Sequence, residues 1–89
     1  MISRTTERFR KALADLPKQV QKQAKDAFQK FKIDPYYPSL RFKRVHSTKP
    51  IYSVRINMDC RAIGIQQENE ITWFWIGSHR DYEKLLLRL

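Results

Sequence analysis

The sequence predicts an α+β domain: an N-terminal helical hairpin packed on a small antiparallel sheet of about four strands, then a short C-terminal helix. Three observations indicate this order. Apolar residues recur at helical spacing up to residue 31, alternate at a period of two between residues 39 and 76, and return to helical spacing at the end. A length of 89 residues suits one domain, expected over residues 1–89.

Two helices are expected in the first third of the chain. The apolar stripe of the first, at i, i+3, i+4 and i+7, is Phe9, Ala12, Leu13 and Leu16. Thr5 or Thr6 is its expected N-cap. Pro17 ends this helix and suits the first turn of the second, whose stripe is Val20, Ala24, Ala27, Phe28 and Phe31. Two X-Pro steps then end the hairpin, because a residue before proline avoids the α conformation.

Alternating apolar residues predict strands over 39–46, 51–57, 60–66 and 71–76, with polar turns at 57–59 and 68–70. The strand over 71–76 is apolar on both sides, so it is expected to be central or covered on both faces. Gly77 and Ser78 are expected to end it. Residues 81–89 are expected to form a helix with the apolar stripe Tyr82, Leu85, Leu86 and Leu89.

The charge is concentrated in the first half of the chain. The whole sequence has 18 Lys and Arg against 9 Asp and Glu, a formal net charge of +9. Residues 1–50 hold 13 of the basic and 4 of the acidic residues, and no acid lies between Asp34 and Asp59. Such a surface indicates a polyanionic or acidic partner. The alternative is a basic surface that only keeps the protein in solution.

Several kinds of site are excluded. The two glycines form no phosphate-binding loop, and Cys60, His46 and His79 lack the spacing of a zinc site. No metal or cofactor is therefore expected. Without an apolar membrane span or secretory signal, and with a single cysteine, a cytoplasmic location is expected. Basic residues, tyrosines and two histidines remain. They suit phosphodiester binding and RNA cleavage by the 2′-hydroxyl, which needs a base, an acid and a cation.

Four segments resemble the RelE/ParE superfamily of bacterial type II toxins: residues 38–45 (PSLRFKRV), 52–57 (YSVRIN), 60–64 (CRAIG) and 73–82 (WFWIGSHRDY). The resemblance implies a helical hairpin against a small antiparallel sheet. RelE-like members usually begin with an extra N-terminal strand. Only Met1 to Ser3 precede the first expected helix here, so this strand is expected to be missing or vestigial.

The resemblance implies one of two activities. RelE-like toxins cut mRNA, usually in the ribosomal A site, whereas ParE-like toxins inhibit DNA gyrase and have no nuclease centre. Arg61 matches a phosphate-binding arginine of RelE, and His79 falls where YafQ-like nucleases carry a catalytic histidine. Ser53 and Arg55 replace a lysine pair of RelE, and Tyr82 lies three residues before the position of RelE's late tyrosine. A metal-independent mRNA endoribonuclease is the favoured interpretation. A gyrase inhibitor and a non-catalytic RNA-binding module are the alternatives.

The expected catalytic residues are His79, Arg61, Arg55, Tyr82 and Asp81. The expected RNA contacts are Arg41, Lys43, Arg44, His46 and Ser53, and the expected antitoxin contacts are Lys22 and Lys25. The implied partners are a cognate antitoxin, mRNA and the ribosome, with DNA reached only through the toxin–antitoxin complex and no membrane.

Alternatives remain for several of these residues. His79 would instead cap a helix or face solvent, Arg61 would pair with Asp59 or Glu83, and Tyr82 would only pack in the core.

Overall fold

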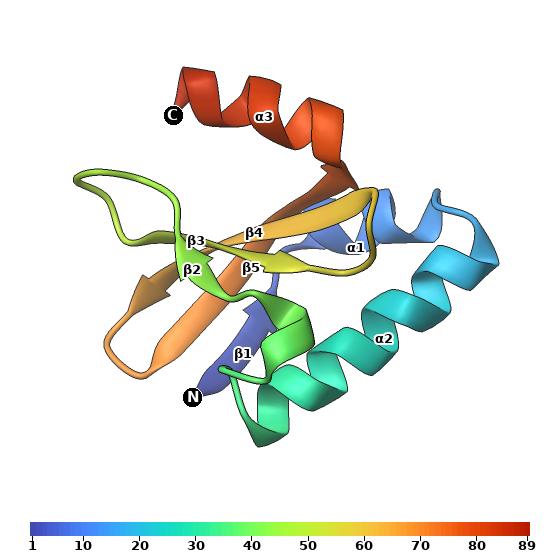
Figure 1. The fold of residues 1–89 in the computed structure, drawn as a ribbon, viewed down its shortest axis with the longest axis horizontal. Coiled ribbons are helices and arrows are strands. Elements are labelled where there is room, and N and C mark those ends of the chain that lie inside the picture. Colours follow the sequence, from blue (N-terminus) through green and yellow to red (C-terminus); the bar gives the residue numbers. More distant parts are fainter.

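The computed structural model describes residues 1–89 as a five-stranded mixed sheet with helices on both of its faces (Figure 1). The elements in chain order are β1 (Ile2–Thr5), α1 (Glu7–Ala14), α2 (Lys18–Ile33), the 3-10 turn η1 (Pro38–Leu40), β2 (Lys43–Arg44), β3 (Ile51–Arg55), β4 (Cys60–Gln67), β5 (Glu70–Ser78) and α3 (His79–Arg88). The strand order is β1-β5-β4-β3-β2. No helix has both the length and the apolar character needed to cross a membrane.

The N-terminal strand is present, so the expectation that it is missing is wrong. β1 pairs in parallel with β5, with Ile2 opposite Glu70 and Thr5 opposite Trp73, which makes the sheet mixed and five-stranded. All four β1 residues are exposed, so the strand has no apolar alternation to reveal it. Backbone hydrogen bonds hold it, together with the indole N–H of Trp73, which donates to the Ser3 hydroxyl at 2.9 Å.

Other element boundaries follow local capping. The Thr6 hydroxyl accepts a hydrogen bond from the Phe9 N–H at 3.0 Å, which confirms the N-cap of α1. α3 begins at His79, two residues earlier than expected, because the Ser78 hydroxyl accepts from the Asp81 N–H at 3.1 Å. The turn before it is shorter than expected, since β5 continues through Gly77 to Ser78.

The prediction of a strand over residues 39–46 is wrong for the first residues of this range. Pro38–Leu40 forms the 3-10 turn, and only Lys43 and Arg44 pair with β3. Arg41 ends the turn in the left-handed conformation, with φ 46° and ψ 43°. Proline fixes its own φ and begins the turn, and the left-handed residue then reverses the chain into β2.

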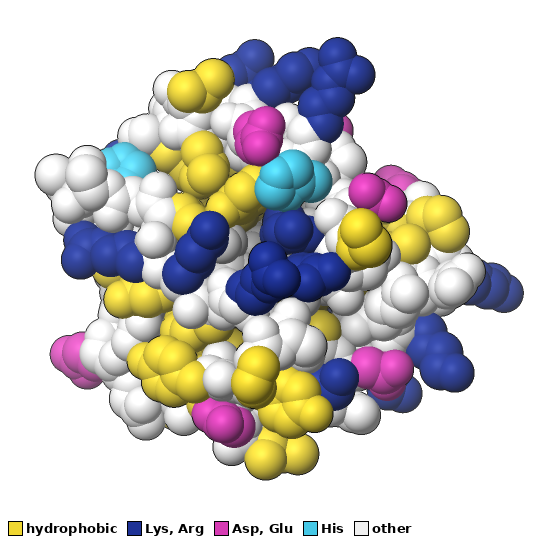
Figure 2. Space-filling view, in the orientation of Figure 1, with side chains coloured by type: hydrophobic (Ala, Val, Ile, Leu, Met, Phe, Trp, Pro, Cys, Tyr) yellow, Lys and Arg dark blue, Asp and Glu magenta, His cyan; other side chains and the backbone are white.

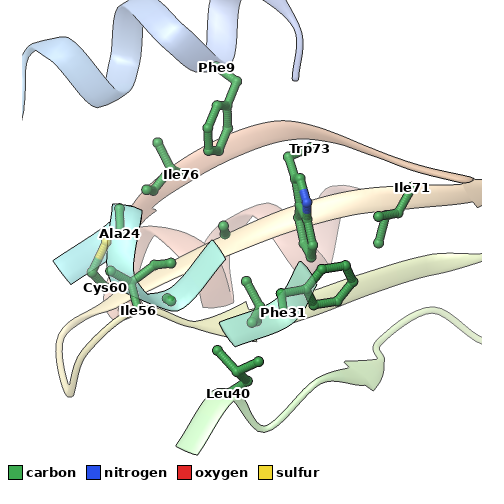
Figure 3. Packing of buried hydrophobic residues seen from close by; sticks show 12 residues of the cluster. Phe9, Ala24, Phe31, Leu40, Ile56, Cys60, Ile71, Trp73 and Ile76 are labelled. Atoms are coloured by element: carbon green, nitrogen blue, oxygen red, sulfur yellow. The ribbon is translucent and has the colours of Figure 1, made fainter. Parts of the chain in front are cut away.

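The main core lies between the sheet and the helices α1 and α2 (Figure 3). Trp73 is fully buried at its centre, with ring centroids 5.3 Å from both Phe28 and Phe31. A β-bulge at Ile63 and Gly64 shifts the pairing of β4 with β5. Gly64 allows close packing there, because a Cβ on it would lie 2.8 Å from Cε3 of Trp73.

A smaller core lies on the opposite face of the sheet, where Tyr82 of α3 packs with Ile51 and Ile63. Trp75 is half-buried against this second core, whereas Trp73 belongs to the first. The prediction that the strand over residues 71–76 is covered on both faces is confirmed, because β5 contributes residues to both cores. Because α3 covers only part of its face, polar side chains at the ends of β3 and β4 remain open.

Cys60 is buried in the main core, and burial raises the pKa of its thiol from 9.0 to about 11. The thiolate is the reactive form, so native protein at pH 8 is expected to react with Ellman's reagent far more slowly than protein in guanidinium.

The same burial makes the stability of the protein depend on pH. The unfolded thiol ionises near pH 9 and the native thiol near 11. The unfolded state therefore loses its proton first, and stability falls as the pH rises between these values.

The measurement is the free energy of unfolding at pH 8 and pH 10, for wild type and for Cys60→Ala. We expect wild type to lose more stability over this interval than the variant, which lacks the thiol but keeps every other titrating group. An equal loss in both proteins, or fast native labelling, would contradict the burial of this thiol.

Candidate functional site

Two arginines lie directly opposite one another on the face of the sheet that α3 leaves open. Arg55 of β3 pairs with Arg61 of β4 in the antiparallel register, and like charges in directly opposed positions are unfavourable. Burial lowers the pKa of Arg61, and the neighbouring Arg55 lowers it further. An anion bound between the two guanidinium groups would relieve this repulsion.

These arginines line a cavity of about 160 Å³, which we call the basic pocket. Its walls come from the residue after η1, from β2, β3 and β4, and from the start of α3: Arg41, Lys43, Ser53, Arg55, Arg61, His79 and Tyr82. Figure 2 shows Lys and Arg side chains gathered at the centre of this face, next to a histidine. No carboxylate lines the pocket. Its lining therefore suits an anion, and it includes one histidine.

His79 is the first residue of α3, and its backbone N–H donates to the Asp59 carbonyl at 2.6 Å. Its side chain is 44% exposed, and Nε2 lies 3.0 Å from Oε1 of Glu83, one helical turn later. Nδ1 is buried without a hydrogen-bond partner. The His79 ring therefore lines the basic pocket, with one nitrogen beside Glu83 and the other buried.

Tyr82 belongs both to the core and to the pocket. It is 5% exposed, and its hydroxyl donates to the Ser53 hydroxyl at 3.2 Å. The ring centroids of Tyr82 and His79 are 5.6 Å apart. Tyr82 therefore packs in the core, as one interpretation of the sequence expects, and it also lines the basic pocket beside His79.

Arg61 holds the β3–β4 turn. Its Nη1 donates to the carbonyls of Asn57 at 2.6 Å, Cys60 at 3.1 Å and Met58 at 3.3 Å. The alternative pairing of Arg61 with Asp59 or Glu83 is wrong: Glu83 pairs with His79 instead. These contacts occupy only one of the guanidinium nitrogens, so the other donors are left for the pocket.

Arg41 reaches the pocket from a strained backbone. Left-handed φ values cost energy for a residue with a Cβ, and such strain is concentrated at functional sites. Among the residues other than glycine, only Arg41 and Glu68 have a positive φ. Glu68 lies in the tight β4–β5 turn, whereas Arg41 lines the basic pocket.

Five of the expected site residues do not line the basic pocket. Asp81 lies beside a different cavity between β5 and α3. The Arg44 Nε donates to the carbonyls of His46 and Lys49, and His46 Nε2 lies 2.8 Å from the Leu89 carbonyl oxygen. Both therefore brace the loop between β2 and β3. The other two, Lys22 and Lys25, are exposed on α2.

Glu83, the partner of His79, was not among the expected site residues. The signal for it is the spacing of four residues on one helix, which is visible only if α3 begins at His79. The structure places no group of three or more His, Cys, Asp or Glu side chains where they could hold a metal ion.

The family model described as ParE-like toxin domain matches residues 18–84. The chain therefore belongs to the ParE-like toxin domain family. No curated protein sequence matches it at a significant level.

Similar solved structures share the fold at low sequence identity. A chain of the RelB–RelE antitoxin–toxin complex from Methanococcus jannaschii has a TM-score of 0.74 and 13% identity, covering 92% of this chain and 96% of that one. The YoeB/ParE toxin from Agrobacterium tumefaciens has a TM-score of 0.70 and 12% identity, covering 89% and 99%. YafQ from E. coli has a TM-score of 0.60 and 13% identity, covering 90% and 94%.

Proposed function

We propose that this protein is the toxin of a toxin–antitoxin pair. It acts as a ribosome-associated, metal-independent endoribonuclease whose own residues suffice to cleave mRNA, and it arrests growth unless its antitoxin binds. The observation that carries the proposal is the basic pocket. It combines four cations with a histidine and a tyrosine and has no lining carboxylate. This composition suits a phosphodiester, which carries negative charge and gains more of it along the reaction.

In the proposed reaction the RNA 2′-oxygen attacks the adjacent phosphorus, and the bond from phosphorus to the 5′-oxygen breaks. The 2′-hydroxyl loses its proton to a base, and the leaving 5′-oxygen gains one from an acid. His79 performs one of these transfers. Arg55 and Arg61 stabilise the charge on the phosphate oxygens, while Ser53 and Tyr82 orient the site. The products are a 2′,3′-cyclic phosphate and a 5′-hydroxyl.

A gyrase inhibitor is the second candidate, and the match to the ParE-like family favours it. In that case the protein acts by binding alone, and the basic pocket contacts gyrase or is not used. The first candidate gives the histidine beside the cations a chemical role, which the second does not.

The antitoxin is proposed by analogy with neighbours of the same fold. Solved structures of similar folds are the RelB–RelE and DinJ–YafQ complexes. An acidic antitoxin segment would be attracted to the basic surface of this chain. Lys22 and Lys25 on α2 are the proposed contacts.

The experiment is a cleavage assay with purified protein on free RNA in EDTA. We expect cleavage to persist and to leave 2′,3′-cyclic or 3′-phosphate ends. Arg55→Ala is expected to lower the rate by about 100-fold, because the variant loses a charged donor aimed at the phosphate. The Arg55 backbone pairs with β4, but its side chain makes no hydrogen bond or ion pair within the protein, so truncating it should leave the fold unchanged.

The matched control is Arg80→Ala, which removes the same charge from an exposed position outside the pocket. The control should cleave at nearly the wild-type rate, and circular dichroism checks that both variants fold. Strict magnesium dependence with 3′-hydroxyl ends would contradict the proposed chemistry. Equal rates for the two arginine variants would contradict the role of the pocket.

A further inference from the structure

A second cavity adjoins the basic pocket and shares one residue with it. This cavity, which we call the α2 cavity, has a volume of about 310 Å³, at the lower end of the range of about 300–1,000 Å³ for small-ligand sites. α2, η1 and the end of β3 form its walls. Arg55 lines both cavities. When one phosphate of an RNA strand lies in the basic pocket, the neighbouring nucleotide can therefore reach the α2 cavity.

The α2 cavity contains an unpaired carboxylate. Asp26 is its only acidic lining residue, and Asp26 forms no salt bridge although Lys22 and Lys30 lie one helical turn to either side. Lys30 and Arg55 also line this cavity, and Asp26 offsets one of these two charges. The Asp26 carboxylate adds a strong acceptor, so the α2 cavity suits a ligand that carries hydrogen-bond donors better than the basic pocket does, which has no lining carboxylate.

Gln23 places a donor next to this acceptor. The Gln23 Oε1 accepts from the Asn57 side-chain amide at 2.7 Å. This fixes the orientation of the Gln23 amide and leaves its amino group free to donate. Gln23 and Asp26 are three residues apart on α2, so they are neighbours on one helix face. Together they present a fixed donor beside two carboxylate oxygens.

Guanine has the complementary edge. Its Watson–Crick edge carries one acceptor, O6, beside two donors, N1–H and the 2-amino group. The Gln23 amino group matches O6, and the two Asp26 oxygens match the two donors. Adenine, cytosine and uracil each offer only one donor group on this edge. In single-stranded RNA this edge is free to bind protein.

We propose that the α2 cavity binds the guanine base of the nucleotide next to the scissile phosphate, and that Gln23 and Asp26 form hydrogen bonds with its Watson–Crick edge. This inference rests on the proposed ribonuclease function and adds to it a preference for one base. Arg55 joins the two subsites, because this residue lines both cavities.

The first test maps cut sites on a random-sequence RNA. We expect wild type to favour guanine at one fixed position beside the cut by about tenfold, the scale of one bidentate contact. Asp26→Asn should abolish this preference while cleavage continues. Asp15→Asn, an equal change of charge at a residue that does not line the cavity, should retain it. A flat wild-type profile, a preference for another base, or an unchanged profile in Asp26→Asn would overturn the inference.

The second test does not depend on cleavage. Guanosine 3′-monophosphate and adenosine 3′-monophosphate are titrated separately into isotopically labelled protein and followed by NMR. We expect guanosine 3′-monophosphate to shift the backbone signals of Gln23, Asp26 and Lys30 and to lose this effect in Asp26→Asn. Equal shifts with both nucleotides, or none at these residues, would overturn the subsite. If wild type cleaves no RNA, the proposed function fails, whereas this titration still decides the base subsite.

Discussion

Replacing His79 with alanine is expected to lower RNA cleavage by about 10²–10⁴-fold, the usual contribution of a general acid or base. His79 is the only histidine that lines the basic pocket, and histidine is the side chain most often used as a general acid or base. His46, the other histidine, is tied to the chain terminus through the Leu89 carbonyl. The measurement is the single-turnover rate on free RNA, together with growth on induction in the absence of antitoxin.

The variant should remain folded, because the His79 side chain is partly exposed and its ion pair with Glu83 lies at the surface. Lys84→Ala is a control on an exposed position of the same helix, outside the basic pocket. Cleavage by His79→Ala within a factor of two of wild type would exclude the catalytic role. Gyrase inhibition that is indifferent to this change would favour the second candidate function.

Replacing Trp73 with alanine is expected to reduce the free energy of unfolding by about 3–5 kcal/mol. The indole is fully buried, contacts aromatic rings from both α2 and the segment before β2, and donates to Ser3 of β1. Small domains are typically stable by only about 5–15 kcal/mol. The loss would therefore remove a large share of the stability of the protein.

Urea denaturation followed by circular dichroism measures this change, and Trp75→Ala is the matched comparison. Trp75 is only half-buried, on the other face of the sheet, so its loss should cost clearly less. Trp73→Phe should recover part of the stability by refilling the core. Equal losses for the two alanine variants would contradict the central position of Trp73.

The parts of the fold that could be predicted are those with a repeating apolar pattern. The stripes of α1, α2 and α3 and the alternation of β3 and β4 each reflect burial of one face. β1 has no such pattern, because its four residues are exposed and are held mainly through the backbone. A short 3-10 turn such as η1 likewise leaves no periodic signal, so the alternation over residues 39–46 predicts a strand that begins too early.

The site was predictable in its residue types but not in its pairings. The excess of basic residues and the resemblance together pointed to Arg41, Lys43, Arg55, Arg61 and His79, which line one pocket. The opposition of Arg55 and Arg61 depends on strand register, and the α2 cavity depends on how a helix packs against the end of a strand. The local sequence predicts neither the strand register nor the packing of this helix.

The β3–β4 turn has a consequence for how the site can vary. Its carbonyls accept hydrogen bonds from the Arg61 side chain and from the His79 backbone. One short loop therefore sets the positions of Arg61 and His79. An insertion or deletion there would displace both groups together, so the loop should tolerate substitution of its exposed side chains, such as Met58, far better than any change in its length.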